Sequence, residues 1–162
     1  MKRLTKFVRG RLYARRSRPR VYYPHGKQYR GTLTVGEGSI LGRVDIDCTG
    51  DVSIGAMCIL SDGIKIFTHS HVFLEGFVPD ITAEKGIRVA RLTIGDTVYV
   101  GEDSMILPQV GEIGDSAIIG ARAVLTRKVG PREIWAGNPA RKVGERPAEH
   151  SLPRKTRDDG AA

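Results

Sequence analysis

The sequence predicts an all-β protein in which short strands stack into a parallel β-helix. Between Ile94 and Val129 an aliphatic residue recurs about every six residues, which is neither the helical period nor simple alternation. A glycine follows four of the six recurring residues, and the residue four places on is always small or β-branched. The recurring residues are Ile94, Val100, Ile106, Ile113, Ile119 and Leu125. Because no six-residue unit can bury its apolar side alone, the units must stack on one another.

Each repeat unit is expected to contain one short strand and one corner. The aliphatic residue points inward and stacks on its equivalent in the next coil. The glycine after it, such as Gly95 or Gly101, is expected to allow a backbone turn that a Cβ atom would obstruct. This pattern alone does not set the hand of the solenoid, since parallel crossovers are normally right-handed.

The repeat occurs together with two further motifs, IFTHSH at 66–71 and AVLTRKVGPREIWAGNPARKV at 123–143. With them the chain resembles the hexapeptide-repeat acyltransferases, in particular the maltose, galactoside and nodulation O-acetyltransferase group. The resemblance extends from about residue 35 to residue 143. It implies a left-handed β-helix with three repeat units per coil, a homotrimer, and acetyl-CoA as co-substrate.

The net charge of +8 comes from one end of the chain. Residues 1–36 hold 11 Lys or Arg and no acid, which leaves 15 basic and 18 acidic residues in the remainder. This distribution argues against nucleic-acid binding by the protein as a whole. Cys48 and Cys58 fall on the repeat register and are expected to be buried small hydrophobes rather than a disulfide or a nucleophile.

The chain of 162 residues divides into three expected parts. Residues 1–32 form a basic N-terminal arm and cap, residues 33–143 the β-helix with a projecting loop at 72–92, and residues 144–162 a disordered tail. Residues 1–20 have helical apolar spacing, with three interpretations: packing on the first coil or across a trimer, docking to an anionic membrane surface, or contact with a polyanion. No secretory signal or membrane-spanning run is visible, so a cytoplasmic location is expected, peripheral to the membrane if the arm docks there.

His71 is the expected general base. A neutral hydroxyl attacks a thioester poorly, and imidazole can accept the hydroxyl proton near neutral pH. The resemblance supports His71, because the family reads approximately I-Y-T-x-T-H where this chain has IFTHSH. His69 lies two residues earlier, on the same side of a strand, and is the alternative base. Two histidines do not make a zinc site with protein ligands alone, so no metal is expected.

The resemblance also indicates residues for the coenzyme and the acceptor. Gly101 and Gly120 take glycine positions that border the coenzyme, and Thr126-Arg127 replaces a Thr-Lys pair that meets its phosphates. Arg141 matches a further basic contact to the coenzyme. Asp47, expected at a corner, is either an acceptor contact or a solvated turn residue. Tyr99 stands where the family often has Trp, as a wall of the site.

The sequence therefore predicts an O-acetyltransferase that moves an acetyl group from acetyl-CoA to a hydroxyl of a sugar or glycan. The alternative is a catalytically inactive trimeric β-helix that docks other components through its basic arm. The fold alone does not separate the two, because one scaffold can host several functions. Binding of the coenzyme does separate them.

Overall fold

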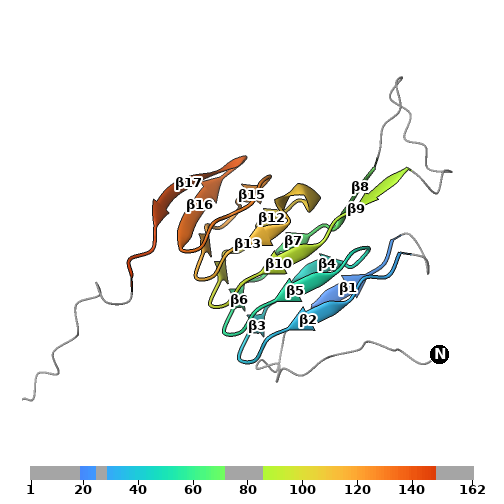
Figure 1. The fold of residues 1–162 in the computed structure, drawn as a ribbon, viewed down its shortest axis with the longest axis horizontal. Coiled ribbons are helices and arrows are strands. Elements are labelled where there is room, and N and C mark those ends of the chain that lie inside the picture. The colour runs from blue at the N-terminus through green and yellow to red at the C-terminus, as the bar shows by residue number, and fades with distance from the viewer. Residues whose placement is uncertain (1–18, 25–28, 72–85, 149–162) are drawn as a thin grey trace, which may run out of the picture.

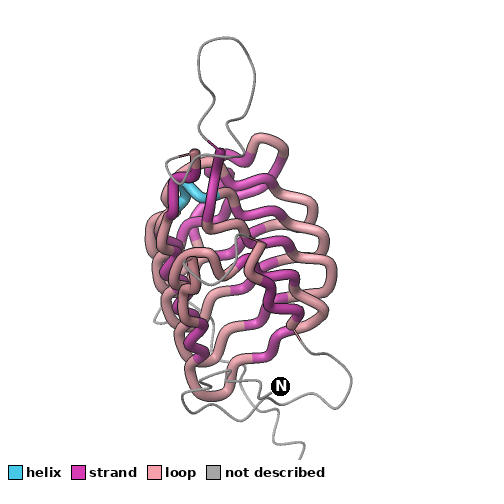
Figure 2. Tube along the Cα trace, turned by 90° about the vertical axis from the view of Figure 1, so that its right-hand side faces the viewer, coloured by secondary structure: helices cyan, strands magenta, loops and turns pink. Residues whose placement is uncertain are grey.

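The computed structural model describes residues 19–24, 29–71 and 86–148. The chain winds into a column of stacked coils, with β1 at one end and β16 and β17 at the other (Figure 1). Seen from the side, the strands of successive coils lie directly above one another (Figure 2). This is the predicted all-β architecture, a left-handed parallel β-helix.

Three sheets form the faces of the column, and their strands are parallel except for β17 at the C-terminal end. Sheet A contains β1 (Arg20–Tyr22), β4 (Asp45–Asp47), β7 (Lys65–Ile66), β12 (Met105–Ile106) and β15 (Val124–Leu125). Sheet B contains β2 (Leu33–Val35), β5 (Val52–Ile54), β10 (Leu92–Ile94) and β13 (Glu112–Ile113). Sheet C contains β3 (Ile40–Leu41), β6 (Ile59–Leu60), β11 (Tyr99–Val100), β14 (Ile118–Ile119), β16 (Glu133–Gly137) and β17 (Ala140–Glu145).

The core is the column of inward-pointing repeat residues. All six recurring aliphatic residues between Ile94 and Leu125 are at most 1% exposed. The small or β-branched residues four places on are buried as well: Val98, Ser104, Val110, Ala117, Ala123 and Val129. Cys48 and Cys58 lie in the same core, and burial raises the pKa of Cys48 to about 12 with help from the nearby Asp47 and Asp51. Both cysteines are therefore packing residues, as predicted.

The repeat glycines serve a different purpose from the predicted one. The left-handed backbone conformation falls two residues later, for example at Thr97 and Asp103, both with a φ of 56°. At Gly101 the difficulty is instead the next coil, since a Cβ there would lie 2.5 Å from the Ala121 nitrogen. The glycine thus permits close stacking of coils rather than the turn itself.

At both ends of the solenoid, strands extend beyond the predicted boundaries of the β-helix. At the N-terminal end β1 pairs in parallel with β4, so part of the predicted cap is a strand of sheet A. At the C-terminal end β17 runs antiparallel to β16 as far as Glu145, which places the predicted start of the tail inside a strand. Residues 1–18, 72–85 and 149–162, which carry most of the predicted arm, loop and tail, lie outside the described residues.

The described part of the chain has one short helix, the 3₁₀ turn η1 (Pro108–Val110). None of the described helical structure is long and apolar enough to span a bilayer.

Candidate active site

One corner of the column collects both predicted catalytic histidines and two of the predicted coenzyme residues, Thr126 and Arg127. We call it the A–B corner, because its segments connect a strand of sheet A to the next strand of sheet B. In successive coils these segments are residues 48–51, 67–91, 107–111 and 126–128. Neighbouring strands in a sheet are about 4.8 Å apart, so residues far apart in sequence meet along this corner.

Between β7 and β10 the chain leaves this corner of the column as an antiparallel ribbon. Strands β8 (His69–His71) and β9 (Ile87–Val89) pair antiparallel and project from the column (Figure 1). The chain is back in the coil at Leu92, which is buried in sheet B, so the predicted loop ends earlier than expected. Both histidines thus lie at the base of a projecting ribbon.

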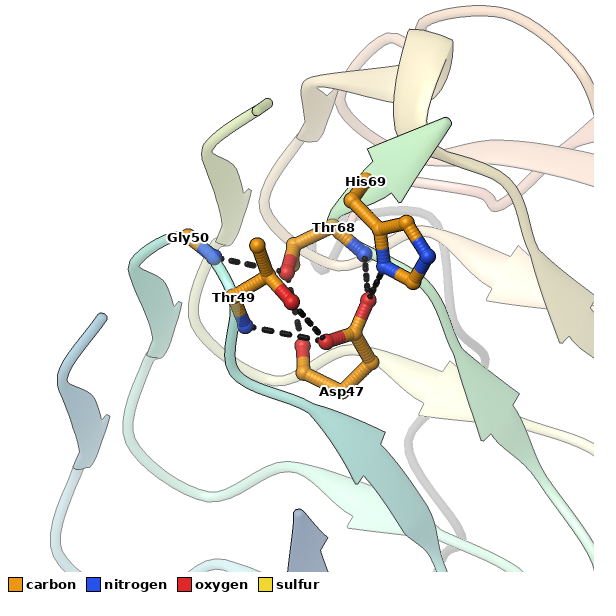
Figure 3. A network of polar contacts seen from close by, with 5 residues as sticks. All are labelled: Asp47, Thr49, Gly50, Thr68 and His69. Atoms are coloured by element: carbon orange, nitrogen blue, oxygen red, sulfur yellow. Dashed lines mark hydrogen bonds and ion pairs between the residues drawn. The ribbon is translucent and has the colours of Figure 1, made fainter. Parts of the chain in front are cut away.

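A buried carboxylate connects the coil below to this ribbon. Both Asp47 oxygens accept two hydrogen bonds (Figure 3). Oδ1 accepts from the Thr49 amide at 2.9 Å and the Thr49 hydroxyl at 2.6 Å. Oδ2 accepts from the Thr68 amide at 3.0 Å and lies 2.5 Å from His69 Nδ1. With all four lone-pair directions in use, Asp47 is a structural anchor for His69.

Thr68 closes this network from the ribbon side. Its hydroxyl donates to the Asp47 carbonyl at 2.8 Å and accepts from the Gly50 amide at 2.9 Å. Asp47 and Thr68 are fully buried, and Thr49 is 2% exposed. A buried network of this kind fixes geometry because any unpaired member would be costly.

The environment of Asp47 also sets its charge. Burial by itself raises the pKa of Asp47, but the hydrogen bonds from Thr49, the Thr68 amide and His69 outweigh burial and hold the pKa below its usual value. A carboxylate at this position favours the Nδ1–H form of the His69 ring, which leaves Nε2 as the basic nitrogen. The expected corner position of Asp47 differs from the structure, in which it ends strand β4 and is not solvated.

The two histidines are in contact with each other. Their ring centroids are 5.3 Å apart and the ring planes are nearly perpendicular, at 86°. The His69 side chain is only 12% exposed, whereas His71 is an exposed residue. His71 is therefore the histidine that an acceptor can reach, and His69 is the one that the protein holds in place.

The predicted coenzyme residues divide into two groups along the two edges of sheet A. Thr126 and Arg127 lie on the A–B corner, two coils beyond the histidine ribbon, or about 10 Å along the axis. Gly101 and Gly120 lie on the opposite corner, where sheet C leads into sheet A.

Two more predicted residues belong to the face beside that second group. Tyr99 is 42% exposed on the outside of sheet C, and Arg141 is exposed on β17 of the same sheet. A single chain therefore does not bring all predicted coenzyme residues into one place.

The sequence did not reveal the Asp47–His69 pair. The one local signal was the spacing of Asp47 and Thr49, since an Asp often accepts a hydrogen bond from the amide two residues on. Its partner is 22 residues away in the next coil, and that pairing depends on the exact coil register. Among the residues that the structure describes, no group of three His, Cys, Asp or Glu side chains is placed to hold a metal ion.

Comparison with known proteins agrees with this architecture. No protein-family model matches the chain. A chloramphenicol acetyltransferase from Morganella morganii is 35% identical over 122 residues, which cover 67% of this chain and 58% of that protein. The chain thus spans a little over half the length of this curated relative.

Two solved structures share the fold. A hexapeptide-repeat acetyltransferase from Vibrio cholerae, in complex with acetyl-CoA, has a TM-score of 0.63 at 21% identity, covering 70% of this chain and 60% of its own. A maltose O-acetyltransferase from Clostridium difficile has a TM-score of 0.63 at 23% identity, covering 88% of this chain and 70% of its own. The chain is a homologue of the hexapeptide-repeat acetyltransferases, as the repeat predicts.

Replacement of the buried carboxylate tests the network. In Asp47→Asn an amide NH₂ must face donors that now point at a carboxylate, so we expect the free energy of unfolding at neutral pH to fall by about 2–4 kcal/mol. Because the pKa of Asp47 is lowered by folding, its stabilisation is present above the ordinary value of 3.8 and is lost as the pH falls through the folded value. Urea denaturation should therefore show the free energies of unfolding of the wild-type chain and of Asp47→Asn converging as the pH falls below 3.8.

Asp45→Asn is the matched control, since Asp45 lies on the same strand and pairs with the exposed Arg20 at the surface. Its loss of stability should be much smaller. An Asp47→Asn protein as stable as the Asp45→Asn protein would contradict the network.

Proposed function

We propose that the chain is an O-acetyltransferase that moves an acetyl group from acetyl-CoA to a hydroxyl of a sugar or glycan. The observation that carries this proposal is the pair of histidines at the A–B corner, with His69 held by a buried carboxylate and His71 exposed against it. The acetyl-CoA complex of the Vibrio cholerae structure supports the donor. The similarity to the maltose O-acetyltransferase from Clostridium difficile supports a sugar acceptor.

In the proposed reaction His71 is the general base. Its ring nitrogen accepts the acceptor's hydroxyl proton as the hydroxyl oxygen attacks the thioester carbonyl carbon. The tetrahedral intermediate then collapses, the carbon–sulfur bond breaks, and the imidazolium returns the proton to the sulfur of CoA. Direct transfer needs no acyl-enzyme, which agrees with two buried cysteines of high pKa.

His69 and Asp47 support this base without being part of the proton transfer. The carboxylate holds the His69 ring, and the His69 ring packs against that of His71 at nearly a right angle. A preoriented base loses less freedom on reaching the transition state. His69 as the base itself is the alternative, since its Nε2 can also take a proton.

The coenzyme is proposed to lie along the A–B corner. Arg127 can pair with its phosphates, because guanidinium matches phosphate oxygens in pairs, and Thr126 adds a hydroxyl donor. Thr126 and Arg127 are about 10 Å along this corner from the histidines, a distance that a long pantetheine arm can bridge. Tyr99 as a wall of the site stays a prediction. A direct contact between Asp47 and the acceptor does not fit its complete burial and its four hydrogen bonds, so Asp47 is proposed to act through His69.

A homotrimer would unite the two groups of coenzyme residues. The A–B corner of one copy and the opposite corner of the next could border one shared groove, with Gly101, Gly120 and Arg141 supplied by the neighbour. An apolar stripe supports such an assembly, because large exposed apolar surfaces mark interfaces. Its members follow one line across the outer face of sheet C: Ile40, Ile59, Tyr99, Ile118 and Ile134.

Replacement of each histidine tests the base. His71→Ala should lower kcat of acetyl transfer by about 100-fold or more, while acetyl-CoA binding is kept. His69→Ala should lose less, because it removes only the ring that holds the base. Ser70→Ala, between them on β8, is the control and should be near normal. Near-normal turnover in His71→Ala together with loss in His69→Ala would assign the base to His69.

A charge on the apolar stripe tests the assembly. Ile59→Glu should convert the trimer to monomers in analytical ultracentrifugation, because burying a carboxylate without a partner is costly. Ser53→Glu is the control at the same level of the coil, on the polar face of sheet B where its neighbours are Thr34 and Thr93. A wild-type monomer, or an Ile59→Glu protein that stays trimeric, would refute this interface.

A further inference from the structure

A groove lies at the A–B corner beside the hydrogen-bond network of Asp47. Its lining comes from three successive coils, residues 29–31, 49–51 and 89–91, and its volume is about 460 Å³. Thr49 and Gly50 belong both to this lining and to the network that holds His69 (Figure 3). The groove therefore begins where the histidine ribbon leaves the column.

Close stacking of main chain builds the groove. A Cβ on Gly31 would lie 2.1 Å from the Gly50 carbonyl carbon, and a Cβ on Gly50 would lie 1.9 Å from the Ala90 oxygen. Both positions must stay glycine for the three corners to stack. The long side chains of the groove are consequently those at its borders, Tyr29, Arg30 and Arg91.

The groove faces the same side of the ribbon as the histidines. Val89 lines the groove, is 47% exposed, and is paired directly with His69 across the two antiparallel strands. Directly paired residues project to the same face, as do residues two apart, so His71 shares this face. A molecule in the groove can therefore present a hydroxyl toward the His71 side.

Two arginines make the groove positive. Arg91 meets the Asp51 carboxylate through one nitrogen at 3.3 Å, which leaves other guanidinium donors for a ligand. The other Asp51 oxygen accepts from the Thr32 amide and hydroxyl, both at 2.9 Å. Arg30 lies 5.4 Å from the centre of the Tyr23 ring, a stacking contact that leaves the guanidinium edge open to an anion.

The remaining lining is neutral. Tyr29 and Thr49 supply hydroxyl groups, and Gly31, Gly50, Val89 and Ala90 carry no charge. Two guanidinium groups against one carboxylate give the groove a net positive charge. Arginine forks match the geometry of carboxylate and phosphate groups, whereas a neutral sugar brings no charged group for them to bind.

We propose that this groove binds the anionic group of the acceptor, a carboxylate or a phosphate, and so selects acidic or phosphorylated sugars over neutral ones. The proposal rests on the proposed acetyl transfer and names the substrate class of the same site.

Three sugars that differ at one carbon test the groove. Glucose, glucuronate and glucose 6-phosphate share a ring and carry a hydroxymethyl, a carboxylate and a phosphoryloxymethyl group in turn. For the full chain we expect Kd, from ligand-observed NMR titration, to be lower by about tenfold for one or both anionic sugars than for glucose. Binding of only one anionic sugar identifies the group that the arginines recognise.

Substitution of the arginines locates the effect. Arg30→Gln with Arg91→Gln should remove the preference for the anionic sugars and leave the Kd of glucose and of acetyl-CoA unchanged. Arg43→Gln is the matched control on another corner. Its ion pair with Asp62 has side chains 78% and 43% exposed, against 75% and 43% for Arg91 and Asp51. This control should keep the preference.

The outcomes separate this proposal from the proposed function. Equal binding of the three sugars, no binding of either anionic sugar at millimolar concentration, or an unchanged preference in the double variant overturns the groove. Acetyl transfer to glucose with no charge preference overturns the groove but keeps the enzyme. Arginine-dependent binding without transfer to any of the three sugars keeps the groove and counts against the transferase.

Discussion

Close stacking of successive coils is the constraint on which the rest of the molecule depends. Each coil hydrogen-bonds to the next along three faces, so its backbone must follow the backbone below it. Where the coils touch at corners, the backbones lie too close together to admit a Cβ atom, as at Gly101 and Gly50. The aliphatic column then fills the interior with no room for larger side chains. Variation is confined to the corners, and the chain uses the A–B corner for its histidine ribbon.

The same stacking places a charge where sequence reasoning would not put one. Asp47 ends a strand of sheet A, one coil below the root of the ribbon, and is fully buried. An ionised carboxylate survives there only because four donors meet it, one of them the His69 ring. The network thus fixes the imidazole ring of His69 to the column of coils. It also joins the histidines to the positive groove along the same corner.

Much of the fold was predictable from the sequence, because a six-residue period has few physical solutions. The inward residues from Ile94 to Leu125 and the buried cysteines follow from local pattern. A projecting segment also follows from it, although the chain leaves the column with β8 (His69–His71), before the predicted start at residue 72. The role of the repeat glycines was not, since it depends on distances between coils. The strand position of Asp47 was not either, because the register slips near Cys48 and moves that residue from the expected corner into β4.

The residue types of the candidate site were predictable, but the contacts between those residues were not. His69 and His71 stand out by chemistry and motif, yet the partner of His69 lies 22 residues away. The grouping of Thr126 and Arg127 with the histidines also depends on coil register. Gly101, Gly120, Tyr99 and Arg141 fall on other edges of the same chain. In the proposed trimer, their relation to the coenzyme would depend on a neighbouring copy, which no local pattern encodes.

The central claim is that the A–B corner binds acetyl-CoA. The most direct measurement is calorimetric titration of the full chain with acetyl-CoA, beside Arg127→Ala and the control Arg20→Ala, which lies in β1 at the other end of sheet A. The account predicts saturable binding that weakens by about tenfold in Arg127→Ala, the loss of one charge-assisted phosphate contact, and is unchanged in the control. A folded protein that binds no acetyl-CoA would contradict the account and favour a β-helix that has kept its architecture without the reaction.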